Sequence, residues 1–290
     1  MWTELGAGMI NTLEKTLNEM PDTTAYLLSD FHPQQLQRLF EIGDLDEKAA
    51  LFDGSLFNEQ LSYSPWLFEF GIESQLFEYY AVTAEEQNVP QGVILLASTD
   101  LDFSQVLKQL QDRLVIRFDG QRQGLLHFQS PVIAHYLFND GAVEDTDRWL
   151  GELKGIIWRH AELKGETDHW RAHIQQHYSK PDQNEWVLTE SQELALARLK
   201  KDQLIKRHCK TLFPDNETAL SEEWWQLQQR FIDDIQACGV SDESLMLQYL
   251  QQCYRPDMEV VYIPIPQSAE RILALPTEQQ RFAVATGHLI

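Results

Sequence analysis

The hydrophobic residues of this chain follow two different periods, and the change between them divides the sequence into two parts. Up to about residue 140, short apolar runs alternate with stretches of helical period, whereas beyond it the helical period dominates. Short apolar runs bounded by Gly or Pro are typical of buried strands, and apolar residues three or four positions apart indicate amphipathic helices. We therefore predict an α/β lobe with a mixed sheet over residues 1–140 and a mainly α-helical lobe over residues 141–290.

Within the first part, three apolar runs predict buried strands, at residues 25–28, 66–70 and 92–96. Helices are expected to begin at Pro33 and Pro131, because proline suits the first turn of a helix. Another helix should follow the third strand, since Thr99 and Asp102 have the spacing of a capping box. Between these helices, apolar runs at 114–118 and 125–128 flank Asp119-Gly120, which predicts a hairpin.

The second part is expected to be a helical bundle with short connections. The acidic stretch 139–147 is interpreted as a loop at the boundary between the lobes. A long helix is predicted over 192–213, a second from the cap Ser221 to the stop at Gly239, and a third from the cap Ser241 to Cys253. The apolar segment 260–266 contains two prolines, so we predict an edge strand or an extended arm there.

Composition indicates a folded, acidic protein that does not bind nucleic acid. The 290 residues carry a formal charge of −22, of which residues 1–150 contribute −16, with 8 Lys and Arg against 24 Asp and Glu. Such a field repels a polyanion and attracts a basic or mixed-charge protein. No run of apolar residues is long enough to cross a membrane, and three cysteines without C-x-x-C spacing fit a reducing compartment, so we expect a cytoplasmic protein.

The chain lacks the common signatures of hydrolases, nucleotide-binding proteins and zinc proteases, and we predict no catalytic residue, cofactor or bound metal. His169, His173 and His177 have the i, i+4, i+8 spacing of one helix face, which leaves three interpretations open: a zinc or nickel site, a solvated helix face, or a pH-sensitive contact. Cys209 follows His208, but neighbouring helical residues point about 100° apart, so we expect a thiol in a core or an interface.

Two features of the second part suggest contacts with other surfaces. A basic run is expected to dock on the acidic first part, to stay solvated or to bind an acidic partner, and it comprises Arg198, Lys200, Lys201, Lys206, Arg207 and Lys210. Aromatic side chains are favoured anchors of protein interfaces. The candidate partner-binding residues are Trp186, Trp224, Trp225, Phe231 and Tyr249, and Trp225 is predicted to point away from the core face that Trp224 occupies.

Four segments carry a resemblance to a known family: residues 25–30 (AYLLSD), 64–69 (SPWLFE), 92–98 (GVILLAS) and 128–131 (FQSP). Together with residues 186–192 (WVLTESQ) at the start of the long helix, their order resembles the effector chaperones or adaptors of the bacterial type VI secretion system. These Tap/TEC-type proteins load effectors onto the VgrG spike. The resemblance covers most of the chain and agrees with the two-lobe prediction.

The resemblance implies a non-enzymatic cytoplasmic protein without a cofactor, which holds a toxic effector and helps load it onto VgrG. Its partners would be the effector and possibly the spike, with neither nucleic acid nor membrane. Two alternatives remain open from the sequence. One is a metal-dependent enzyme that uses His169, His173 and His177, and the other is an acidic immunity protein that neutralises a basic toxin.

Overall fold

The structure, a computed structural model, divides into two compact units that we describe separately. The first unit comprises Met1–His160 and Asp168–Leu196, and the second comprises Ala161–Thr167 and Ala197–Ile290. The residues that the structure describes are 15, 18–42, 47–71, 74–76, 79–80, 92–120, 122–139, 141–160, 169–176, 186–212, 222–253, 264–265 and 268–287.

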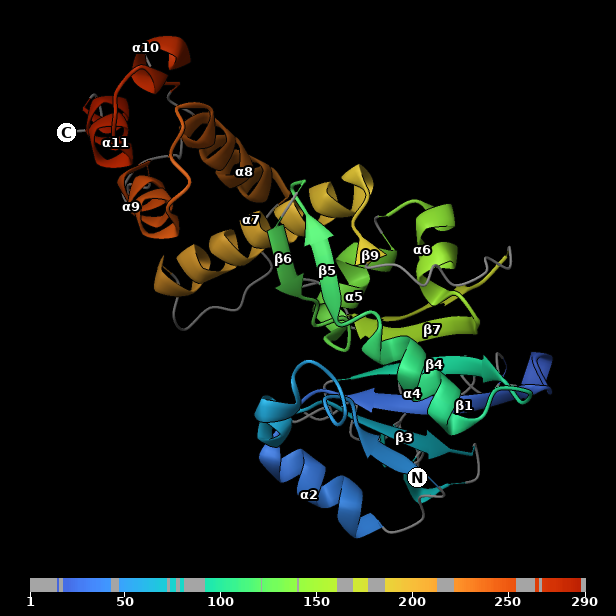
Figure 1. The fold of residues 1–290 in the computed structure, drawn as a ribbon. Coiled ribbons are helices and arrows are strands. Elements are labelled where there is room, and N and C mark those ends of the chain that lie inside the picture. Colours follow the sequence, from blue (N-terminus) through green and yellow to red (C-terminus); the bar gives the residue numbers. More distant parts are fainter. Residues whose placement is uncertain are drawn as a thin grey trace. The chain divides into compact units, whose positions relative to one another are not determined.

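An antiparallel sheet forms the centre of the first unit (Figure 1). In the described part of the chain its strands, in spatial order, are β2 (Lys48–Ala50), β3 (Trp66–Phe70), β1 (Thr23–Ser29), β4 (Gly92–Ser98), β7 (Leu153–His160) and β8 (His169–Ile174). The central strand β1 pairs with both β3 and β4, so that Ser29 at its end lies opposite Trp66 and Gly92.

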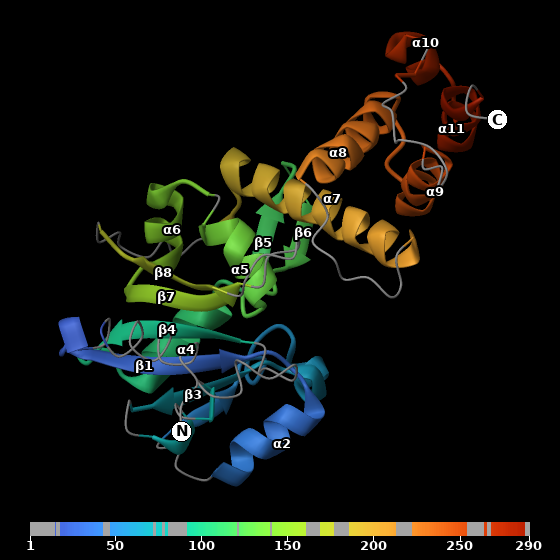
Figure 2. The same ribbon diagram turned by 180° about the vertical axis from the view of Figure 1, so that it is seen from behind.

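Alternate side chains of the sheet enter two hydrophobic cores, one on each face. On one face, Leu28 and Leu95 pack with α4 (Phe103–Gln111), α5 (Pro131–Phe138) and α6 (Val143–Leu150). On the other face, Leu27 and Leu96 pack with α2 (Pro33–Ile42). Figure 1 shows α4 in front of the strands, and Figure 2 shows β1 and β4 in front of α4. Burial on both faces explains why the predicted strands are apolar throughout.

Smaller elements complete the first unit. The hairpin of β5 (Val115–Phe118) and β6 (Arg122–Leu125) is joined by β9 (Trp186–Val187), which pairs in parallel with β5. Asp119 and Gly120 in the hairpin turn both have positive φ, a conformation that Gly adopts freely and Asp tolerates. A 3-10 helix, η1 (Asn58–Tyr63), lies in the loop between β2 and β3.

The second unit is helical. Its described helices are α7 (Glu190–Leu212), whose first residues belong to the first unit, α8 (Glu222–Ala237), α9 (Glu243–Cys253), α10 (Ala269–Leu273) and α11 (Glu278–Thr286). Their shared core includes Ile205, Phe231 and Tyr249. Gly239 ends the α8 segment with a φ of +76°, as its position after the last apolar residue predicted.

These elements confirm the predicted fold class, a mixed sheet with helices followed by a helical region. The boundary expected near residue 140 needs correction, because β7 and β8 extend the first sheet and the first unit continues to Leu196. The stretch interpreted as a loop contains α6, an amphipathic helix that buries Trp149 and Leu150. Glu144 is exposed, but Asp147 is buried beside Trp149 and Leu150, and this acidic residue on the buried side hid the helical period.

Three smaller predictions also change. Asp102 and not Thr99 caps α4, through a capping box with Gln105. Asp242 and not Ser241 caps α9, because its Oδ1 accepts a hydrogen bond from the backbone N–H of Leu245 at 3.0 Å. The second strand of the hairpin ends at Leu125, where the sequence suggested that it would begin. The cap Ser221 and most of the segment 260–266 lie outside the described residues.

Candidate protein-binding surface

The loop between β2 and β3 is closed at its base by hydrogen bonds. The backbone N–H of Leu51 donates to the carbonyl oxygen of Pro65 at 2.8 Å, and that of Phe52 donates to Ser64 Oγ at 2.9 Å. From α4, the Gln111 amide donates to the carbonyl oxygens of Leu51 at 3.2 Å and Asp53 at 2.6 Å. These bonds hold both ends of the loop, residues 51–65, against the sheet and α4.

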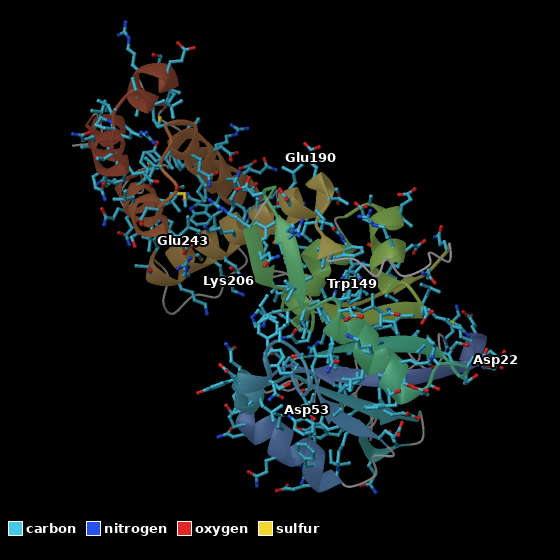
Figure 3. All side chains as sticks on the ribbon, viewed as in Figure 1. Asp22, Asp53, Trp149, Glu190, Lys206 and Glu243 are labelled. Carbon is cyan, nitrogen blue, oxygen red and sulfur yellow. The ribbon has the colours of Figure 1, made fainter. Side chains whose placement is uncertain are left out.

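The tip of this loop exposes large apolar side chains. Leu56 is 87% exposed, Tyr63 is 66% exposed and Leu61 is 41% exposed. We call these three side chains the loop surface. Figure 3 labels Asp53 at the beginning of the tip, with the loop drawn beside the strands of the first unit. Three such side chains within eight residues of one anchored loop make this segment the candidate interaction site.

The loop surface adjoins the end of β1. The ring of Phe31, two residues beyond the strand, meets the ring of Tyr63 edge to face with 5.4 Å between centroids. Just before it, Asp30 Oδ1 accepts hydrogen bonds from the backbone N–H of Phe31 at 2.9 Å and from the buried amide of Gln129 at 3.0 Å. The same Gln129 nitrogen lies 3.1 Å from Nδ1 of His127.

The end of β1 is therefore where the four segments of the family resemblance meet. The first segment, residues 25–30, contains most of β1 and the Asp30 that follows it, and β1 pairs through Ser29 with Trp66 of the second segment and Gly92 of the third. The fourth segment reaches Asp30 through Gln129. Residues far apart in the sequence thus build one corner of the first unit, next to the loop surface.

Gly92 is required where β1 and β4 approach each other at this corner. A Cβ atom at this position would lie 2.7 Å from the carbonyl oxygen of Leu28 and 3.1 Å from Cα of Ser29. We expect the Gly92→Ala substitution to lower the free energy of unfolding by about 1–3 kcal/mol, because backbone atoms must shift. Urea unfolding would measure the loss. The Gly71→Ala substitution, with no atom within 4 Å, is the control, and equal effects would contradict this account.

Four of the five predicted partner-binding residues lie in hydrophobic cores. Trp225 and Phe231 are each 1% exposed, Tyr249 is fully buried and Trp186 is 3% exposed. Trp225 faces the core, which corrects the prediction that Trp224 would do so, and Trp224 is only partly buried. The helix itself was predicted correctly, but the side of it that faces the core was not. The apolar residues of α8 span a wide arc, so the sequence did not fix which of the two tryptophans points inward. As core residues, these four do not present an interaction surface.

Trp186 has a structural role in the first unit. Its ring lies between two guanidinium groups, with Cζ of Arg113 4.6 Å and Cζ of Arg148 5.0 Å from a ring centroid. Buried Arg113 also donates from Nε to the carbonyl oxygen of Trp149 at 3.2 Å. Cation–π contacts of this kind stabilise partly desolvated cations. Trp186 therefore joins β9 to α6 and to the segment that follows α4.

The basic run on α7 makes ion pairs inside its own unit. Arg207 Nη2 lies 2.6 Å and Lys200 Nζ 3.5 Å from carboxylate oxygens of Glu243 on α9. Lys201 pairs with Asp233 on α8. Figure 3 labels Glu243 on α9 and Lys206 on α7. Arg198 Nε also lies 3.9 Å from Oδ2 of Asp202, so ion pairs within the helical unit account for four of the six basic residues.

The histidines at 169 and 173 lie on strand β8, not on the helix that their spacing suggested. His173 Nε2 lies 2.7 Å from Oδ1 of Asp147, whose side chain is 2% exposed. The backbone N–H of Gln176 donates to the other carboxylate oxygen at 3.2 Å. His177 lies outside the described residues, and the described part of the chain contains no group of three side chains suited to hold a metal ion.

The cysteine thiols are protonated at neutral pH. Burial raises the pKa of Cys253 to about 12 and also raises the pKa values of Cys209 and Cys238. Because the thiolate is the reactive form, we expect iodoacetamide at pH 8 to modify Cys253 at least about tenfold more slowly in the folded protein than in urea. Mass spectrometry of timed samples would measure this. Equal rates in both states would show that the thiol is not buried.

Part of the first unit matches a known protein family. Residues 25–148 match a family described as "Domain of unknown function (DUF4123)". The matched region is less than half of the chain and contains the sheet corner and the loop surface. No significant match was found among curated proteins or among solved structures. In the described part of the chain, no helix has the length and hydrophobicity that a membrane span requires.

The loop surface leaves no recognisable pattern in the sequence. Between residues 51 and 65, Leu56 and Leu61 are five residues apart and Leu61 and Tyr63 are two apart, so the three do not follow one continuous helical or strand period. Their exposure follows from the closure of the loop base, which depends on the side chain of Ser64 and on Gln111 from a distant helix.

Proposed function

We propose that this protein is a non-catalytic cytoplasmic adaptor that binds a type VI secretion effector and helps load it onto the VgrG spike. The observation that carries the proposal is the match of residues 25–148 to the DUF4123 family, in the region that holds all four segments of the resemblance. Those segments converge at the end of β1, beside exposed apolar side chains. An adaptor needs such a preformed surface, and catalysis does not.

The chemistry of the described residues also favours binding over catalysis. The three thiols have raised pKa values, and the closest His–Asp contact, between His173 and Asp147, is nearly buried. A buried pair that also accepts a backbone N–H acts as a structural link between β8 and α6. Surface charge is the second support, because a strongly acidic adaptor steers basic or mixed-charge partners toward itself.

The test is affinity purification of the tagged full-length chain at moderate salt from a bacterium that carries its type VI system. We expect a secretion effector to co-purify in about equal amount with the chain, together with VgrG. Deleting the chain should leave less soluble effector in the cell. Recovery of neither protein would contradict the proposal. If the chain instead inhibits the activity of a purified toxin, the immunity-protein alternative replaces it.

A further inference from the structure

We infer that the loop surface binds a segment of the partner protein in which large apolar side chains stand beside Lys or Arg. This inference rests on the proposed adaptor function and adds the chemistry of the contact. It is carried by the exposure of the loop tip, the rigidity of the loop base and the charge of the surrounding chain.

The apolar part of the contact follows from the tip itself. Leu56, Leu61 and Tyr63 lie within eight residues of one another, and they are three of the seven most exposed large hydrophobic side chains among the described residues. Covering them removes apolar surface from water, which is worth about 25 cal/mol for each Å². The anchored base lowers the entropic cost of binding, because the loop is already held in place.

The basic part of the contact follows from the charge around the tip. The loop, residues 51–65, contains two acidic residues, Asp53 and Glu59, and no Lys or Arg, and both acidic residues are exposed. A partner segment with only apolar side chains would leave these carboxylates without a partner, and an acidic segment would be repelled. A segment with Lys or Arg next to apolar side chains matches both the apolar side chains and the carboxylates of the loop.

A second copy of this chain is a poor occupant. Pairing two loop surfaces would bring two copies of Asp53 and Glu59 together, within a chain whose formal charge is −22. Like charges brought together at an interface oppose association. The occupant is therefore a different protein with a basic character where it meets the loop.

The experiment uses the full-length chain and two fluorescein-labelled 14-residue peptides of equal hydrophobicity. One peptide alternates Leu and Phe with Lys, and the other has Glu in place of Lys. Fluorescence anisotropy should show binding of the Lys peptide at least about tenfold tighter than binding of the Glu peptide, with affinity that falls as salt rises. The Leu56→Ser/Tyr63→Ser double variant should weaken binding of the Lys peptide by at least about tenfold.

Two further variants separate apolar from electrostatic contributions. Leu273→Ser, at an exposed position on α10 of the second unit, is the matched control and should leave affinity unchanged. Asp53→Lys/Glu59→Lys should narrow the preference for the Lys peptide over the Glu peptide, because it removes the two carboxylates of the loop and adds two like charges. The inference is overturned if the loop variants bind the Lys peptide as the unaltered chain does, or if a dimer forms that Leu56→Ser/Tyr63→Ser dissociates. Circular dichroism confirms that each variant is folded.

The same variants distinguish this inference from the proposed function. If the unaltered chain co-purifies with an effector and Leu56→Ser/Tyr63→Ser does so equally well, the adaptor function stands and the loop surface is not its contact. If the unaltered chain recovers no effector while the peptide preferences hold, the adaptor function fails and the surface retains its binding chemistry.

Discussion

Replacing Trp225 by alanine is expected to lower the free energy of unfolding by about 3–5 kcal/mol, a larger loss than that expected for Gly92→Ala. The indole is 1% exposed in the core of the helical unit, so its removal leaves a cavity. Its Nε1 also donates to Oδ1 of the buried Asp202 at 3.2 Å, and the substitution removes that donor. Urea unfolding followed by circular dichroism would measure the loss.

The Trp225→Phe variant separates the two causes. It keeps most of the aromatic volume and removes the hydrogen bond to Asp202, so we expect a smaller loss of about 1–2 kcal/mol. Gln229, which also donates to Oδ1 of Asp202 at 3.1 Å, remains in place. A Trp225→Ala protein that kept its stability but lost its partner would instead restore Trp225 as an interface residue.

Lowering the pH from 7 to 4 is expected to remove on the order of 3 kcal/mol of stability through His208 alone. This side chain is fully buried in the helical unit, and burial lowers its pKa from 6.5 to about 4. Between these two values the unfolded chain binds a proton that the folded chain does not. Stability is therefore complete above about pH 6.5 and falls as the pH decreases toward 4. Urea midpoints at half-unit pH steps would measure the profile.

The His208→Phe variant is the control for this pH dependence. Phenylalanine preserves an aromatic ring near Trp224, with which the imidazole stacks at 6.3 Å between centroids, and it cannot titrate. Its stability should change much less between pH 7 and 4.5 than that of the unaltered chain. Carboxylates with lowered pKa values, such as Glu243 beside Arg207, add a loss at lower pH in both proteins. Parallel profiles for the two proteins would rule out His208 as the cause.

The elements of the fold that sequence reasoning predicted best are those buried on both sides or marked by a strong local signal. Strand β4 is apolar throughout because cores cover both of its faces, and α2 and α5 begin at prolines. The strands β7 and β8 were missed because β8 mixes His, Arg and Trp, whose spacing also fits a helix. For β8, only its pairing with β7 decides between those conformations.

The candidate site was harder to predict than the fold, for a physical reason. Aromatic side chains bind partners and also fill cores, and the sequence does not distinguish the two uses. Trp186 lies between Arg113 and Arg148, which are 73 and 38 residues before it in the chain. The exposed side chains of Leu56 and Tyr63 follow from loop closure by Ser64. Both outcomes depend on tertiary contacts that local patterns do not encode.

The closed base of the 51–65 loop separates two requirements that selection would otherwise place on the same residues. Leu51, Phe52, Ser64 and Pro65 join the loop to the sheet, and the residues between them make no contribution to strand pairing. Substitutions at exposed positions of the tip, such as Leu56, can therefore accumulate without weakening the scaffold, whereas Phe57 packs on the core. A lineage of such proteins could exchange this short stretch to follow a changing partner while the β-sheet stays the same.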